Sequence, residues 1–94
     1  MIEQSQQQKI ESVFNSIRDL VLEKNKRYGD IALTPLNIFS NLNSTEGILQ
    51  RLDDKLSRVK NSTELRKNDI ADIVGYLSLL CVSKEWLDFK EFID

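Results

Sequence analysis

The spacing of apolar residues constrains the fold of this chain most strongly. Large apolar side chains recur at steps of three and four residues in three separate stretches, and no stretch alternates apolar with polar residues as a half-buried strand does. Steps of three and four residues place side chains on one face of an α-helix. The sequence therefore predicts an all-α fold, a small helical bundle of three long helices plus a short C-terminal helix.

The first helix is expected over residues 3–26. Its apolar stripe consists of Ile10, Val13, Phe14, Ile17, Leu20 and Val21. The helix should end before Gly29, which can adopt the left-handed conformation common at helix ends. Residues 29–43, which contain the only proline, Pro35, are expected to form a loop whose apolar residues cap the core. Alternatively, this loop closes over one end of a binding cleft.

The second helix is expected to begin near Asn43 or Ser44, because Asn43 and Glu46 have the spacing of a capping box. Its apolar stripe is Ile48, Leu49, Leu52, Leu56 and Val59. Residues 61–63 should end this helix and cap a third helix over residues 64–82. The third helix is expected to bury Leu65, Ile70, Ile73, Val74, Leu77, Leu80 and Cys81. Ser83 is expected to cap the fourth helix, which carries Trp86, Leu87, Phe89 and Ile93.

The size and charge of the chain limit its partners. Its 94 residues make one domain, residues 1–94, and a domain this small is marginally stable alone, so a homo-oligomer is expected. The net charge of −2 offers no broadly basic face, so a nucleic acid polymer is not an expected partner. The polar start and the lack of an apolar run of about 20 residues indicate a cytoplasmic protein without a membrane partner.

The residue types also limit the chemistry. The chain has no histidine, so catalysis would have to use carboxylates with a hard cation such as Mg²⁺ or Mn²⁺. Its single cysteine, Cys81, lies in an apolar run and is interpreted as a buried free thiol rather than a nucleophile. No residue is assigned a catalytic role from the sequence.

The first candidate cluster closes the first helix and consists of Lys24, Asn25, Arg27 and Tyr28. Basic residues at a helix C-terminus interact favourably with the helix dipole, which is sufficient to explain them. The functional alternative is that the lysine, asparagine and arginine contact a phosphate or a base edge while Tyr28 stacks on the base.

The second cluster lies on one face of the second helix, because Arg51, Asp54, Lys55 and Arg58 follow i, i+3, i+4, i+7 spacing. It can be a solvated face with neighbouring opposite charges. Alternatively, Asp53 or Asp54 helps to hold a metal while Lys55 and Arg58 hold phosphate.

The third cluster, Asp69, Asp72 and Tyr76, forms a column on the third helix. Two carboxylates one turn apart repel each other unless a cation lies between them, which indicates a metal or a basic partner. In the simpler alternative, Asp69 favours the helix dipole and Asp72 pairs with Lys55 or Arg58. Gly75 costs about 1 kcal/mol relative to alanine within a helix, so it is expected where another helix or a ligand approaches closely.

Together, these motifs resemble the small phage and bacterial nucleotide-modification-associated proteins, which are related in pattern to the MazG-type all-α NTP pyrophosphohydrolases. The resemblance covers about residues 20–80 and rests on Lys-Asn-x-x-Tyr-Gly-Asp, Arg-x-Asp-Asp-Lys-x-x-Arg and Asp-x-x-Asp-x-x-x-Tyr. It implies a helical nucleotide-binding cleft, completed by oligomerisation, with Asp53 and Asp54 in place of paired glutamates and with Asp69 and Asp72 as further Mg²⁺ ligands. The chain departs from the pattern at Arg58, where another carboxylate is expected.

The sequence thus favours a nucleotide-binding protein of phage origin that sequesters a phosphate-bearing nucleotide, such as a signal of host defence. Lys55, Arg58 and Arg51 would clamp the phosphate, and Tyr28 or Tyr76 would stack on the base. The first alternative is a Mg²⁺-dependent NTP pyrophosphohydrolase with its metal on Asp54, Asp69 and Asp72. The second is a protein-interaction module built on Trp86, Phe89 and Phe92. The nucleotide hypothesis requires the acidic column and the cationic face to meet across one groove.

Overall fold

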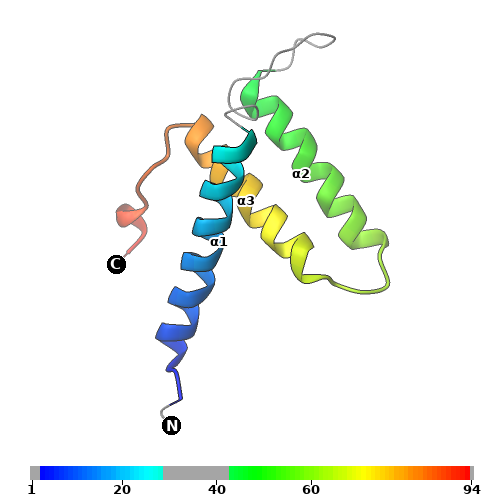
Figure 1. Cartoon of the computed structure of the whole chain (residues 1–94). Helices are drawn as coiled ribbons and strands as arrows, with labels where there is room; N and C mark the ends of the chain where they lie inside the picture. Colours follow the sequence, from blue (N-terminus) through cyan, green and yellow to red (C-terminus); the bar gives the residue numbers. More distant parts are fainter. Residues whose placement is uncertain (1–2, 29–42, 94) are drawn as a thin grey trace.

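The computed structural model describes residues 3–28 and 43–93, which form three α-helices and one short 3₁₀ turn (Figure 1). The helices are α1 (Gln6–Tyr28), α2 (Ser44–Asn61) and α3 (Lys67–Ser83), and the turn is η1 (Lys90–Phe92). The described part contains no strand, which confirms the all-α prediction. No helix in it is both long and apolar enough to span a membrane. The predicted turn at Gly29 and nearly all of the predicted loop lie outside the described residues.

The start of α2 follows the predicted capping pattern. The side-chain Oδ1 of Asn43 accepts a hydrogen bond of 2.8 Å from the backbone N–H of Glu46, so it satisfies one of the donors that a helix N-terminus leaves unpaired. Glu46 also places a negative charge in the first turn, where the helix dipole favours it. Local side-chain chemistry therefore fixes this helix end.

The antiparallel pair of α2 and α3 forms the best-packed part of the molecule (Figure 1). The hydroxyls of Thr45 and Ser83 lie 3.0 Å apart near one end, and Lys55 meets Asp72 farther along. The buried apolar side chains of the described core are both on α2: Ile48 is 1% exposed and Leu52 is 6% exposed. Leu49 and Leu56, predicted to share this stripe, are exposed because α3 covers only the side of α2 that carries the buried pair.

The connection between α2 and α3 delays the start of α3 beyond the predicted residue 64. The hydroxyl of Ser62 accepts a hydrogen bond from the N–H of Glu64 and donates one to its carbonyl, at 3.1 and 2.7 Å. Such local bonds offer the backbone an alternative to the helix. The residue before α3 is Arg66, whose side chain makes no capping hydrogen bond. The prediction that residues 61–63 cap this helix is therefore wrong.

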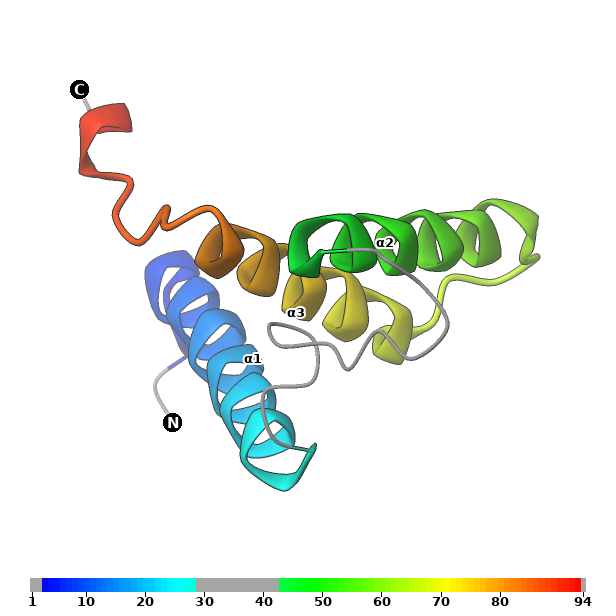
Figure 2. The same ribbon diagram turned by 90° about the horizontal axis from the view of Figure 1, so that it is seen from above.

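Helix α1 crosses α3 and makes no helix–helix contact with α2 among the described residues (Figures 1 and 2). A Cβ on Gly75 would lie 3.4 Å from Cγ2 of Val21, so the predicted close approach of another helix to Gly75 is confirmed. Farther toward its N-terminus, α1 extends past α3, and Ile10, Val13 and Phe14 are exposed. The predicted stripe is therefore only partly covered, because α3 reaches only its C-terminal half.

Helix α3 ends in a Schellman motif. The N–H of Trp86 donates to the carbonyl of Cys81 at 2.9 Å, and the N–H of Glu85 donates to that of Val82 at 3.0 Å. Glu85 has a φ of 60°, in the left-handed region that usually selects glycine. Ser83 belongs to α3, so its predicted role as the cap of a fourth helix is wrong.

The predicted fourth helix is only the turn η1, and the apolar side chains around it are not buried. The backbone N–H of Lys90 donates to Oδ1 of Asp88 at 2.8 Å, which stabilises a single turn. The exposed large apolar residues here are Trp86, Leu87, Phe89, Phe92 and Ile93. Just before α3, Leu65 is exposed. On α3, Ile70 and Leu77 are exposed and Cys81 is half-buried. These four were predicted to be buried, but α1 and α2 cover only two sides of α3.

Candidate functional site

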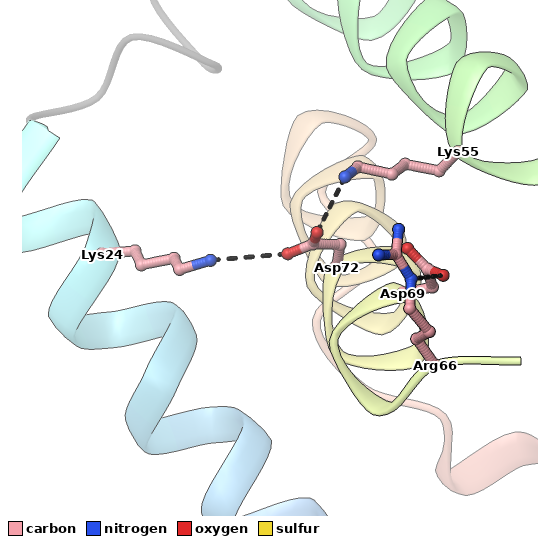
Figure 3. A network of polar contacts seen from close by, with 5 residues as sticks. All are labelled: Lys24, Lys55, Arg66, Asp69 and Asp72. Atoms are coloured by element: carbon pink, nitrogen blue, oxygen red, sulfur yellow. Dashed lines mark hydrogen bonds and ion pairs between the residues drawn. The ribbon is translucent and has the colours of Figure 1, made fainter. Parts of the chain in front are cut away.

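Asp72 lies at the meeting point of the three helices and binds a lysine from each of the other two (Figure 3). Its Oδ2 lies 2.8 Å from Nζ of Lys55 on α2. Its Oδ1 accepts a hydrogen bond of 3.4 Å from Nζ of Lys24 on α1. We call Lys24 and Lys55 the lysine pair, because their ammonium groups converge on one carboxylate.

The helix stripes explain this convergence. Lys55 comes three residues after Leu52, which is buried, so both project from the face of α2 that meets α3. Lys24 comes three residues after Val21, whose methyl group approaches Gly75. Asp72 in turn precedes Gly75 by three residues on α3. The polar contacts therefore continue, by one helical turn, the same faces that make the apolar contacts.

The electrostatics of the cluster hold Asp72 ionised. The hydrogen bond from Lys55 lowers the pKa of Asp72 below its usual value; burial opposes this, and the charges of Lys55 and Lys24 add to it. The side chains of Asp72 and Lys55 are 21% and 19% exposed, whereas that of Lys24 is 54% exposed. One carboxylate and two ammonium groups have a formal net charge of +1. Lys24, the lysine that is more exposed to solvent, carries most of this excess.

Asp69 is buried one turn before Asp72, and its Oδ2 lies 3.5 Å from Nε of Arg66 (Figure 3). This pairing was not predicted, although the i, i+3 spacing of Arg66 and Asp69 could have indicated it. The basic partner that two carboxylates one turn apart require is thus present for each: Arg66 for Asp69 and the lysine pair for Asp72. The simpler interpretation, that Asp72 pairs with Lys55 or Arg58, is confirmed for Lys55.

Two of the three predicted metal ligands are paired with basic side chains in this arrangement, and the third is exposed to solvent. Both oxygens of Asp72 are bound by ammonium groups, Asp69 is directed toward Arg66, and Asp54 is exposed. Within residues 3–28 and 43–93, no three acidic or cysteine side chains gather closely enough to hold a metal ion. A cation at Asp72 would have to displace Lys55 from Oδ2. The metal site on Asp54, Asp69 and Asp72 stays a prediction.

The other predicted nucleotide contacts come from the same helices as this cluster. Arg27 donates to Glu23 on its own helix at 3.0 Å. Arg51 and Arg58 are exposed on α2, and Asn25 and Tyr76 are half-buried. Tyr28 ends α1, and its side chain lies outside the described part. The predicted meeting of α2 cations with the acidic column is therefore made by Lys55 rather than by Arg58.

The lysine pair can bind an anion other than Asp72. Each ammonium group has three donors, and lysine serves as a flexible point charge for phosphate oxygens. Two lysines already directed at one carboxylate supply the positive charge and the donors that a phosphate group requires. Comparison of the chain with protein-family models, with curated proteins and with solved structures finds no match.

Proposed function

We propose that the lysine pair binds the phosphate of a nucleotide. The single observation that carries this proposal is the convergence of Lys24 and Lys55, from different helices, on one small anionic group. An arrangement that directs two ammonium groups toward one anionic group before the ligand arrives lowers the ordering needed on binding. Because the side chain of Lys24 is exposed, a phosphate in solution can contact this part of the site.

Within this proposal, the residues of the cluster have different tasks. Lys55 is largely buried and keeps its short contact with Asp72, so it forms the fixed part of the site. Lys24 has the longer contact and the more exposed side chain, so it turns from Asp72 to the phosphate. Asp72 is a positioning residue that directs both ammonium groups to one point before the phosphate arrives and holds Lys55 there afterwards, while the remaining donors of Lys55 contact the phosphate. Exposed Arg51 and Arg58 on α2 attract the anion, and Tyr76, one turn beyond Asp72, offers a ring face for the base.

Binding without hydrolysis is the form of the proposal that the geometry favours. A carboxylate engaged by two lysines is a poor general base and a poor metal ligand, because both oxygens are already bound. Such a protein would sequester a nucleotide in the cytoplasm, including a signal of host defence if the chain is encoded by a phage. The alternative, a Mg²⁺-dependent NTP pyrophosphohydrolase, is favoured only by the one-turn spacing of Asp69 and Asp72 on α3.

The test is calorimetric titration of the chain with linear and cyclic nucleotides, in EDTA and in Mg²⁺, followed by chromatography of the recovered ligand. We expect metal-independent binding with intact ligand. Because a hydrogen bond to a charged group contributes about 1.5–3 kcal/mol, Lys24→Gln and Lys55→Gln should each weaken binding at least tenfold. Lys55→Arg, which keeps the charge, should retain part of the affinity.

The matched control is Lys84→Gln, which removes an exposed lysine beyond the end of α3 and should leave the affinity unchanged. Circular dichroism of each variant separates lost binding from lost folding. Equal affinities for Lys24→Gln, Lys55→Gln and the control would reject the lysine pair as the site. Release of pyrophosphate in Mg²⁺ alone would favour the enzymatic alternative.

A further inference from the structure

The N-terminal half of α1 carries an apolar surface that nothing in the described structure covers. Ile10, Val13 and Phe14, which we call the α1 overhang, are 52–66% exposed. They continue the stripe whose later member Val21 packs against Gly75 of α3. Figure 1 shows this part of α1 projecting beyond α3. One continuous apolar face is therefore half covered and half open.

A second apolar surface follows the end of α3. Residues 84–93, which we call the C-terminal arm, carry five large apolar side chains that are each 51–79% exposed. The rings of Phe89 and Phe92 pack against each other, with centroids 6.4 Å apart. In Figures 1 and 2 the arm and the overhang both lie on the side of the molecule opposite to α2. The arm turns away from α3 at Glu85, whose strained, left-handed backbone conformation sets the direction of the arm.

The combined apolar area matches what a stable dimer requires. The four exposed aromatic residues of the two surfaces amount to about 500 Å², taking about 200 Å² for each whole side chain. The four aliphatic residues add about 250 Å², taking about 100 Å² for each whole side chain, which is the area that corresponds to their burial free energy at about 25 cal/mol per Å². If a partner covered all of it, about 750 Å² would be buried on each copy, close to the roughly 800 Å² that each partner buries in a typical specific complex. Exposed apolar surfaces larger than roughly a few hundred Å² commonly mark protein–protein interaction sites.

We infer that a second copy of this chain covers the α1 overhang and the C-terminal arm. A helix stripe with i, i+3, i+4 spacing is complementary to another copy of itself, because apolar side chains of one helix fit between those of the other. In a two-fold symmetric dimer, the same patch of both chains meets at the interface, so neither chain leaves its patch exposed. The charges beside the overhang, Lys9 and Glu11, are of opposite sign, so two copies can meet without net repulsion. This inference does not depend on nucleotide binding.

The test is sedimentation equilibrium of the full chain, without nucleotide, over micromolar to hundred-micromolar concentrations. We expect a mass twice that of the 10.9 kDa chain. Val13→Asp and Phe92→Asp should each raise the dissociation constant at least tenfold. The matched control, Asn15→Asp, adds the same charge to an exposed position away from the stripe and should leave association unchanged. Circular dichroism should show the same helix content in all four proteins.

The single tryptophan, Trp86, provides a second measurement, because it lies in the arm. Its emission should shift to shorter wavelength as the wild-type chain is concentrated, and it should not shift in Val13→Asp. A monomeric mass throughout the range overturns the inference. So does a blue-shifted emission that is independent of concentration, which would mean that the arm folds back on its own chain. Equal association of Val13→Asp and Asn15→Asp would also overturn it.

Discussion

Replacing Gly75 with alanine should stabilise the protein, although Gly75 is buried where two helices cross. Alanine is favoured over glycine by about 1 kcal/mol within a helix. The new methyl group would meet Cγ2 of Val21 at 3.4 Å, which is an ordinary van der Waals distance. It would therefore fill space between α1 and α3 without separating them. We expect a gain of about 1 kcal/mol, which corresponds to a rise in Tm of about 4–8 °C for a domain of this size.

A larger side chain at the same position should have the opposite effect. The branched side chain of Gly75→Leu has no room beside Val21, so it must displace α1, and overpacking of this kind costs about 1–3 kcal/mol. The control is Gly47→Ala on α2, where a Cβ would meet nothing within 4 Å. That substitution reports helix propensity alone.

The assay is urea unfolding of the three variants and the wild type, followed by circular dichroism at one fixed protein concentration. Stabilisation by both alanines with destabilisation by leucine agrees with the crossing of α1 and α3 at Gly75. If Gly75→Leu is as stable as Gly75→Ala, then α1 does not pack at this position. If Gly75→Ala is destabilising while Gly47→Ala is not, then α1 and α3 lie closer together than the 3.4 Å between the added Cβ and Cγ2 of Val21 indicates.

Two further predictions concern the end of α3 and the lysine–aspartate cluster. Glu85→Gly should raise the free energy of unfolding by about 1 kcal/mol, because a left-handed conformation costs a non-glycine residue about 1–2 kcal/mol; no gain in urea unfolding would mean that this strain is relieved in solution. The pKa of Asp72 is lowered in the folded state, so its ionised carboxylate stabilises the fold. This contribution to the free energy of unfolding should be fully present above the unfolded pKa of about 3.9 and should be lost as the pH falls through the folded pKa. The stability difference between wild type and Asp72→Asn, measured by urea unfolding, should thus be constant above about pH 5 and shrink below about pH 4; a constant difference down to pH 2 would contradict the pairing.

The features that could be predicted from the sequence are those set by neighbours along the chain. The cap at Asn43 depends on one side chain and a backbone N–H three residues away, and the capping pattern identifies it. The pairing of Asp72 with a cation follows from the repulsion of two carboxylates one turn apart. The choice of Lys55 over Arg58 depends on which side of α2 faces α3, and charge spacing alone does not reveal this.

The features that could not be predicted depend on contacts between distant segments. Lys24 reaches Asp72 across 48 positions in the chain, and no local pattern indicates that contact. Apolar spacing shows that α1 has an apolar face but not how far α3 extends along it, so it does not reveal that Phe14 is exposed. Ser83 was assigned to a cap because serine is common there, whereas it is the last residue of α3, and the left-handed residue that follows the helix is Glu85, a residue type that gives no signal for a helix end.

The way α1 is attached has a consequence for how the molecule opens and assembles. The α2–α3 pair is joined by a short connection, so its contacts close a small loop and can form early and independently of the rest. Within residues 3–28 and 43–93, helix α1 contacts only α3 among the helices, through the crossing at Gly75 and the contact of Lys24 with Asp72. Of the three helices, α1 is therefore the one whose amides should exchange with solvent first, as a unit that separates while the α2–α3 hairpin persists.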